Sequence, residues 1–310
     1  MILCLGTTPV YQRSMSFDGL VLDDVNRAAA VADYASGKSI NVARVARTLG
    51  EEVLASGFVG GSRGEQLCRD LDASGIRHDF VRVAGETRQC VTVIDRAAAT
   101  ATELVQESAP VEVEDWRALD EKLTVLLPAA RVWIFSGTLP PGGPQDFYAR
   151  WLPLARRSGA LAVLDARGEA MRLALKHPGF VLKINRDELA ATAGEELSEE
   201  SRLLAAMRRF CPSDGKIIIT MGAGGALVDD GRSAWRVISP PIRAVSAVGS
   251  GDAFAAGLGI ALSRGESLPD ACRLAAACGA ANAKTDRAGH LHLQDVEQLR
   301  PQVNIAELRL

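Results

Sequence analysis

Short apolar runs that alternate with amphipathic stretches constrain this chain more than any other feature of its sequence. Five of these runs have the length and composition of buried strands: VLASGFVG, RVWIFSG, ALAVLD, FVLKIN and KIIITMG. Two stretches between them place apolar residues on one helical face: Val42, Val45, Ala46 and Leu49 in the first, and Trp116, Leu119, Leu123 and Leu126 in the second. The alternation predicts βαβ units, and therefore an α/β fold around a mostly parallel sheet.

Two segments, residues 11–35 and 77–107, interrupt this alternation. Within the second, HDFVRV and CVTVID alternate polar and apolar residues, as strands with one exposed face do. We expect the two segments to form a small β-sheet lid on a single α/β domain that spans residues 1–310. A third stretch, LVDDGRSAWRV, predicts a hairpin that turns at an Asp-Gly pair.

Charge and residue usage exclude several classes of protein. The net charge of −3 over 310 residues, without a long basic run, argues against a nucleic-acid partner. No apolar run reaches about 18 residues and the start lacks a signal peptide, so we expect a cytoplasmic protein without a membrane partner. The six cysteines form no CxxC pair, and His290 and His292 lack acidic or thiol neighbours, so we expect buried thiols and a surface turn, not a metal site.

The stretch VGSGD precedes AFAAGLGIALSRG, which has the composition of a helix. Gly249, Ser250 and Gly251 would open that helix, where unpaired N–H groups and the helix dipole attract an anion. A carboxylate at Asp252 does not help to bind an anion, but it suits removal of a proton from a hydroxyl that attacks phosphorus. The alternative is an aspartate that only caps the helix or favours its first turn.

Four motifs in order resemble the PfkB family of ribokinase-like carbohydrate kinases. They are SGKSINVARVARTLG (36–50), FSGTLPPG (135–142), LKINRDEL (182–189) and VSAVGSGDAFAAGL (245–258). The branch most similar in GETR, SGTLPPG and LDARGEAMRLAL is that of the 1-phosphofructokinases, 6-phosphofructokinases and tagatose-6-phosphate kinases. The resemblance implies a ribokinase-like three-layer α/β/α fold with a β-sheet lid that can also pair two subunits. It also implies ATP-dependent phosphorylation of a hexose phosphate.

On the nucleotide side, the resemblance implies that Asp252 is the general base and that Gly249, Ser250 and Gly251 form the anion hole. It implies that Asn185 and Glu188 hold Mg²⁺ through water, which suits a cation that keeps its hydration shell. The other implied nucleotide-binding residues are Lys183, Thr220, Gly222, Gly224, Gly225 and Asn282. These motifs also have structural alternatives. Asn185 and Glu188 could be a strand end followed by an acidic first helical turn, and Thr220 with its glycines could be a strand-to-hairpin turn. Asn282 could lie in an ordinary packed helix.

On the acceptor side, Arg88 in GETRQ matches the family's arginine for the sugar-bound phosphate, which a planar guanidinium can grip by two oxygens. Lys38 would add a second cation and Asn41 a hydrogen bond to a sugar hydroxyl. The other implied acceptor-binding residues are Gln12, Ser36, Gly37, Ser136 and Thr138.

The departures from the family pattern gather on this acceptor side. The family's NPAxD is TTPVYQ here, so Thr8 replaces the asparagine and Gln12 the aspartate, and Ser36 and Ser39 replace glycines of GGKGxN. We therefore expect an active kinase with a shifted acceptor preference. The candidates are fructose 1-phosphate, fructose 6-phosphate and tagatose 6-phosphate; an unphosphorylated sugar, a nucleoside, or a non-catalytic sensor of the same fold are the alternatives. A dinucleotide-dependent oxidoreductase would need GxGxxG after the first strand, where the chain reads GTTPVYQ.

Overall fold

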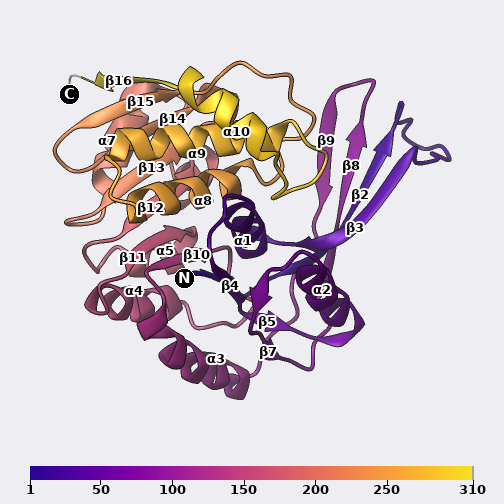
Figure 1. Ribbon diagram of the computed structural model, residues 1–310, viewed down its shortest axis with the longest axis horizontal. Helices are drawn as coiled ribbons and strands as arrows, with labels where there is room; N and C mark the ends of the chain where they lie inside the picture. The colour runs from indigo at the N-terminus through magenta and orange to yellow at the C-terminus, as the bar shows by residue number, and fades with distance from the viewer. Residues whose placement is uncertain (309–310) are drawn as a thin grey trace.

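A computed structural model describes residues 1–308, and a ten-stranded sheet forms its centre (Figure 1). The strand order is β16-β15-β14-β13-β12-β11-β10-β1-β4-β6. The strands are β1 (Ile2–Leu5), β4 (Val53–Ser56), β6 (Arg77–His78), β10 (Val132–Ser136), β11 (Leu161–Asp165), β12 (Val181–Asn185), β13 (Lys216–Thr220), β14 (Ala226–Asp229), β15 (Ala234–Ile238) and β16 (Asn304–Leu308). All pairs from β13 to β6 are parallel, which confirms the predicted mostly parallel sheet. The predicted hairpin is β14 and β15.

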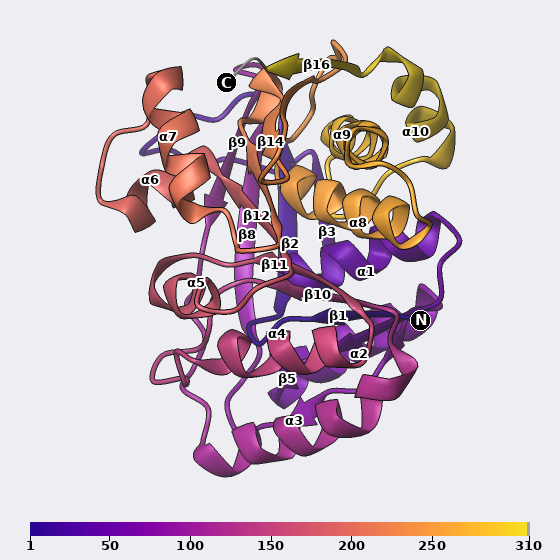
Figure 2. The ribbon, with the colours of Figure 1, turned by 90° about the vertical axis from the view of Figure 1, so that its left-hand side faces the viewer.

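Helices cover both faces of this sheet, as Figure 2 shows. One face carries α1 (Lys38–Thr48), α2 (Gly61–Ala73), α8 (Ser250–Ser263), α9 (Leu268–Ala283) and α10 (Leu293–Leu299). The other carries α3 (Val113–Leu126), α4 (Phe147–Arg157), α5 (Gly168–Ala174), α6 (Arg186–Ala193) and α7 (Glu200–Phe210). Side chains alternate along a strand, so Ile2 and Cys4 of β1 pack under the first layer and Leu3 under the second. The predicted three layers are confirmed.

Helix α1 begins at Lys38, four residues before Val42, the first residue of the apolar face that predicted it. Its N-cap, Gly37, has a φ of 103°, and a Cβ there would lie 3.1 Å from Cα of Pro9. A glycine is needed at this point because the chain turns directly from a strand into α1 beside another segment of backbone. The turn brings Lys38 to the first position of the helix.

Four strands form a separate sheet, hereafter the lid sheet, which projects beside α1 in Figure 1. Its order is β3 (Ala30–Ser36), β2 (Val10–Phe17), β8 (Arg88–Asp95) and β9 (Thr100–Leu104). These strands come from the two segments predicted to form a lid. Residues 77–82 do not join them: β6 extends the central sheet beside β4, and β7 (Val81–Arg82) pairs with β5 (Phe58–Val59). An edge strand of the body has the same alternating pattern as a lid strand, so the pattern alone did not separate the two.

The register of the lid sheet gives it two different faces. On one face, Gln12 lies between Tyr34 and Cys90, and Ser14 donates from Oγ to the backbone oxygen of Asp286 at 3.2 Å. This inner face therefore contacts the loop that follows α9. The outer face carries a row of apolar side chains, Val31, Met15 and Val93, in adjacent strands. Val31 has 55% of its surface exposed.

The histidine and cysteine predictions meet different outcomes. All six cysteines are free and all but Cys211 are buried, as expected. His290 closes a turn that begins at Arg287, as expected, but it is only partly exposed: its ring packs edge-on against Tyr34 at 5.4 Å, and burial lowers its pKa to about 4. Within residues 1–308 there is no group of three or more His, Cys, Asp or Glu side chains placed to hold a metal, and no helix long and apolar enough to cross a membrane.

Candidate active site

The carboxyl ends of the central parallel strands bring the predicted residues to one edge of the sheet. Ser136 ends β10 and is paired in register with Asp165, which ends β11; Asn185 ends β12 beside Thr220, which ends β13. The strand order reverses direction around β10 and β1, and ligands of open α/β sheets bind at the carboxyl edge of such a switch point. The candidate site lies at this edge, between the sheet and the start of α8.

The predicted anion hole is a tightly held turn. Gly249 is the N-cap of α8 with a φ of 82°, and a Cβ there would lie 2.8 Å from Cα of Ala288. Asn282 is completely buried and braces this turn: its Nδ2 donates to the backbone oxygen of Val248 at 2.8 Å, and its Oδ1 accepts from the backbone N–H of Gly289 at 2.8 Å. Its amide is thus bound within the protein at both ends. The sequence did not reveal this bracing role, because the partners of Asn282 come from two other segments.

Asp252 lies in the first turn of α8, yet it does not cap the helix. Its Oδ2 accepts from Nδ2 of Asn41 at 2.7 Å, and the residue is only 7% exposed. Burial raises the pKa of Asp252 to about 6, and the negative charge of Asp165 adds to the rise, against the opposing effects of Lys38 and Lys183. A carboxyl with this pKa is suited to accept a proton near neutral pH.

A buried group of charges lies beside this carboxyl. Asp165 binds two ammonium groups, Lys38 Nζ at 2.7 Å and Lys183 Nζ at 2.6 Å. Burial favours the neutral acid, but the two cations outweigh it and hold the pKa of Asp165 below its usual range. Sequence reasoning missed Asp165. The available signal was a single carboxylate that closes the apolar strand ALAVLD at the edge where the other site residues lie.

Lys183 does not reach into open solvent. It is 3% exposed, and a Cβ added to Gly251 would lie 2.8 Å from its Nζ. The ammonium group is therefore packed beneath the first turn of α8, next to the predicted anion hole. Lys38 is more accessible, because its side chain is 34% exposed.

Asn185 and Glu188 form a capping box at the start of α6. Oδ1 of Asn185 accepts from the backbone N–H of Glu188 at 2.7 Å, and Glu188 accepts from the backbone N–H of Asn185 and, at 3.0 Å, from Nζ of Lys38. The two residues thus form the acidic first helical turn that was the structural alternative for this motif. The same capping box also fixes one carboxylate and one amide oxygen at the edge of the site. A hydrated Mg²⁺ fits such a pair, because it takes few protein ligands and keeps water and phosphate oxygens around it.

The glycine loop predicted for the nucleotide follows β13. Thr220 ends that strand, and the residues 222–224 form a short 3₁₀ turn before Gly225 starts the return into β14. A Cβ at Gly225 would lie 1.9 Å from the backbone oxygen of Val237, so the turn is packed against β15. Gly222 and Gly224 are exposed at its tip.

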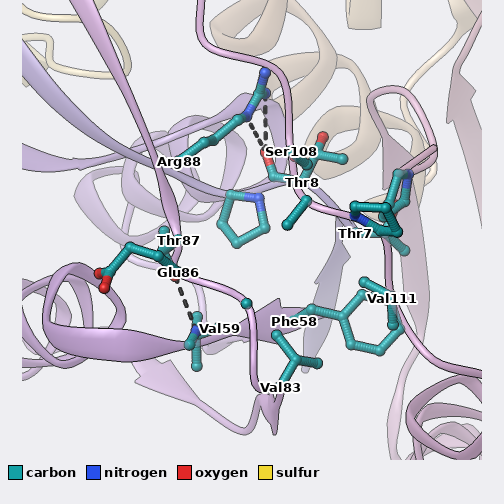
Figure 3. A pocket seen from close by; sticks show the side chains of 16 residues that line it. Thr7, Thr8, Phe58, Val59, Val83, Glu86, Thr87, Arg88, Ser108 and Val111 are labelled. Carbon is teal, nitrogen blue, oxygen red and sulfur yellow. Dashed lines mark hydrogen bonds between the residues drawn. The ribbon is translucent and has the colours of Figure 1, made fainter.

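On the acceptor side, Arg88 borders a small hollow shown in Figure 3. Its guanidinium donates to the backbone oxygen of Thr8 at 3.0 Å and to that of Gln106 at 3.3 Å. The hollow lies between the chain leaving β1, the end of β5, and the loop that contains Ser108. Its volume of about 30 Å³ has room for water but not for a sugar.

The residues that depart from the family pattern turn their side chains into the protein. Gln12 is 2% exposed and donates from Nε2 to Oγ1 of Thr92 at 2.9 Å. Ser36 donates from Oγ to Oδ1 of Asn41 at 2.9 Å. Ser39 is buried beside Gly6, where an added Cβ would lie 2.3 Å from the serine Oγ. Neither serine hydroxyl occupies the open side of the site.

The central loop after β10 carries one unusual hydroxyl. Ser136 is 2% exposed, and its Oγ has no hydrogen-bond partner among the described residues. The loop itself is held firmly: Tyr148 of α4 donates from its hydroxyl to the backbone oxygen of Gly137 at 2.8 Å, and the Oγ1 atoms of Thr7 and Thr8 donate to that of Thr138. A buried hydroxyl without a partner is costly, so Ser136 is the kind of group that a ligand completes.

Comparison with known proteins places this geometry in a family. Residues 1–293 match the family described as pfkB family carbohydrate kinase. A putative phosphofructokinase from Staphylococcus aureus is 27% identical, with 99% of each chain covered and a TM-score of 0.80. Phosphofructokinase-2 from Escherichia coli, solved with substrates and products, is 25% identical over 97% of this chain and 98% of its own, with a TM-score of 0.88.

A possible 1-phosphofructokinase from Thermotoga maritima covers 99% of each chain with a TM-score of 0.91 at 20% identity, which shows the same ribokinase-like fold. The family match spans most of the chain, and the predicted motifs lie at one edge of the sheet in that fold. The chain therefore belongs to the pfkB family of carbohydrate kinases, the ATP-dependent phosphotransferases that use an alcohol group as acceptor.

Proposed function

We propose that this kinase transfers the γ-phosphoryl group of ATP to a hydroxyl of a hexose phosphate of the fructose or tagatose type. The observation that carries the proposal is the carboxyl of Asp252, buried at the N-terminus of α8 with a pKa of about 6. In the proposed step, the acceptor hydroxyl gives its proton to Asp252 while its oxygen forms a bond to the γ-phosphorus. The bond between that phosphorus and the bridging oxygen breaks, and ADP leaves.

The first turn of α8 would stabilise the charge on the transferred group. Its N–H groups and dipole favour an anion, and Lys183 adds a positive charge beneath Gly251. Asn282 holds the turn in shape through Val248 and Gly289, so we assign it a bracing role instead of direct contact with the nucleotide. Mg²⁺, when bound near Asn185 and Glu188 through water, would neutralise phosphate charge there.

Arg88 supports a phosphorylated acceptor. It stands where the lid sheet meets the body and is held only by backbone oxygens, so its guanidinium has no carboxylate partner among the described residues. A phosphate group would offer it the stronger, charge-assisted contact. Gln12 supplies an amide where the family has a carboxylate, and it is already bound to Thr92. This favours an acceptor preference different from that of a relative with the aspartate.

We also propose that the lid sheet pairs two subunits. Its outer face exposes Val31 and Leu104, each 55% exposed, and the connection between β2 and β3 exposes Leu22 and Val25. Apolar side chains gathered on a sheet are costly in water and favour contact with a second surface. A tetrameric inhibited form is known for the E. coli phosphofructokinase-2, which supports association in the family.

Coupled ATP turnover tests the proposal. The acceptors should be fructose 1-phosphate, fructose 6-phosphate, tagatose 6-phosphate, the free hexoses, pentoses and nucleosides, with Asp252→Ala as the control. We expect a Mg²⁺-dependent rate with one hexose phosphate that the substitution abolishes. A rate with only free sugars or nucleosides would contradict the phosphorylated acceptor, and ATP binding without any turnover would indicate a sensor.

A further inference from the structure

Ser36, the last residue of β3, is linked to the carboxyl of Asp252 through one intervening side chain. Its Oγ donates to Oδ1 of Asn41 at 2.9 Å, and Nδ2 of Asn41 donates to Oδ2 of Asp252 at 2.7 Å. All three side chains are more than 90% buried. Ser36 and Asn41 are only five residues apart, at the end of the lid sheet strand β3 and the start of α1, whereas Asp252 in α8 is 211 residues from Asn41.

The chemistry of the three groups fixes the direction of these hydrogen bonds. An ionised carboxylate can only accept, so the Asn41 amide must turn its nitrogen toward Asp252. The amide oxygen then faces Ser36 and needs a donor there, which the serine hydroxyl supplies. A glycine at position 36 has no side-chain donor and would leave the buried amide oxygen without this bond.

We propose that Ser36 is a positioning residue for the catalytic base: it locks the orientation of the Asn41 amide, which in turn orients the carboxylate of Asp252. The inference rests on the proposed role of Asp252. It gives a function to one of the serines that replace family glycines, and it places that function away from the sugar. Because Ser36 belongs to the lid sheet, the position of β3 affects the orientation of the Asp252 carboxylate.

Loss of the Ser36 hydroxyl has a predictable electrostatic effect. The freed amide either rotates or binds less firmly, so Asp252 loses a hydrogen bond that favours its ionised form. The charged groups that face Asp252 from other elements, Lys38 of α1, Asp165 of β11 and Lys183 of β12, stay in place. The proton affinity of Asp252 should therefore rise, whereas the affinity for ATP should not change.

The test compares Ser36→Ala, Ser36→Gly and Ser36→Thr, with Ser39→Ala as the matched control. Ser39 is an equally buried serine three residues away, and it packs against Gly6. The pH dependence of kcat should show an acidic limb about half a pH unit higher in the Ala and Gly variants. That shift corresponds to a roughly threefold loss of kcat at low pH, where the base is mostly protonated. The Thr variant, which keeps the hydroxyl, and the Ser39 variant should match the unmodified enzyme.

A double substitution tests the route through Asn41. If Ser36 acts on the base through the amide, adding Ser36→Ala to Asn41→Ala should cause no further change in the profile. Additive effects, or an unshifted acidic limb in Ser36→Ala, would overturn the proposal.

A measurement without substrate separates this proposal from the proposed function. The Asp252 carboxyl can be titrated by ¹³C NMR on protein labelled at aspartate Cγ, with Asp252→Asn used to assign its signal. We expect a higher midpoint in Ser36→Ala than in the unmodified protein. An equal midpoint would reject the positioning role of Ser36 even if no acceptor had been found. A shifted midpoint in a protein without kinase activity would instead reject the proposed function alone.

Discussion

Oδ1 of Asp165 lies 2.7 Å from Nζ of Lys38, which ties the first residue of α1 to the end of the central strand β11. Lys38 is thus held at the carboxyl edge of the sheet by a carboxylate that no solvent reaches. Burial alone would lower the pKa of Lys38, but Asp165 and Glu188 raise it above its ordinary value, so the lysine stays charged. A permanent positive charge is therefore presented beside the proposed base.

Asp165→Asn removes the buried carboxylate between the ammonium groups of Lys38 and Lys183. We expect the free energy of unfolding to fall by about 3 kcal/mol, because breaking a buried ion pair leaves an uncompensated charge. Urea unfolding at pH 7 measures this. The acidic limb of kcat should also move to lower pH, because the negative charge of Asp165 helps to raise the pKa of Asp252. A shift to higher pH would show that Asp165 acts on the base in another way.

Asp252→Asn should change how stability depends on pH. The folded-state pKa of Asp252 is about 6 against 3.8 for the free side chain, so the native protein binds the extra proton between these values. Stability conferred by the protonated form is therefore lost as pH rises from about 4 to 6. The asparagine variant escapes this loss and should be more stable above pH 6, by about 3 kcal/mol. Urea unfolding of both proteins from pH 4 to 7 checks the prediction; a pH-independent difference would refute it.

Arg88→Ala should weaken binding of a phosphorylated acceptor. The lost charge-assisted contact is worth about 1.5–3 kcal/mol, so KM for the sugar phosphate should rise roughly 10- to 100-fold. KM for ATP should stay nearly constant, since within residues 1–308 Arg88 donates its hydrogen bonds to Thr8 and Gln106 and to none of the residues proposed for the nucleotide. Steady-state kinetics with each substrate varied in turn measures the two KM values. Equal effects on both would mean that Arg88 does not hold the acceptor phosphate.

Gly6→Ala should destabilise the protein through a clash with Ser39. The added Cβ would lie 2.3 Å from the serine Oγ and 2.9 Å from the backbone oxygen of Ser136. Overpacking of this kind costs about 1–3 kcal/mol. Adding Ser39→Gly should restore part of the loss but not all of it, because the Ser136 backbone remains. Thermal unfolding of the single and double variants measures the coupling free energy between positions 6 and 39. Fully additive effects on stability would contradict a direct contact between the two residues.

Leu104→Lys should disrupt subunit pairing if the outer face of the lid sheet is an interface. A lysine there would have to be desolvated against an apolar surface. The matched control is Val125→Lys on α3, where the valine is 77% exposed and outside the lid sheet. Sedimentation analysis should show smaller particles for the lid variant only. Unchanged sedimentation of Leu104→Lys would exclude this face from the interface.

The alternation of strands and helices predicted the layers of the fold because buried parallel strands leave a clear apolar signal. The lid was predicted too large, since residues 77–82 have the pattern of any half-exposed strand and only their pairing with β4 and β5 assigns them to the body. The site motifs predicted which segments meet, and Asp252 and Asn41 do meet although 211 residues separate them.

The motifs did not reveal the partners of each side chain. They indicated Lys183 and Asn282 as nucleotide-binding residues, but they did not show that Lys183 is bound to Asp165 or that the amide of Asn282 is bound on both sides. In the sequence, Ser36 is only a replacement for a family glycine, whereas in the structure its hydroxyl donates a hydrogen bond to Asn41. Such contacts depend on side-chain packing between elements, and no local sequence pattern records them.

The pairing of β2 with β8 has a consequence for the order of folding. Each strand has a nearby antiparallel neighbour, β3 or β9, so two hairpins can form early and independently. Their parallel junction joins Val10 to Arg88, and α1, β4 and α2 lie between them in the chain. Closing such a long loop is entropically costly until the intervening elements have docked. We therefore expect the junction to form late, so the sheet that carries Arg88 and Ser36 is completed only after α1, β4 and α2 have docked.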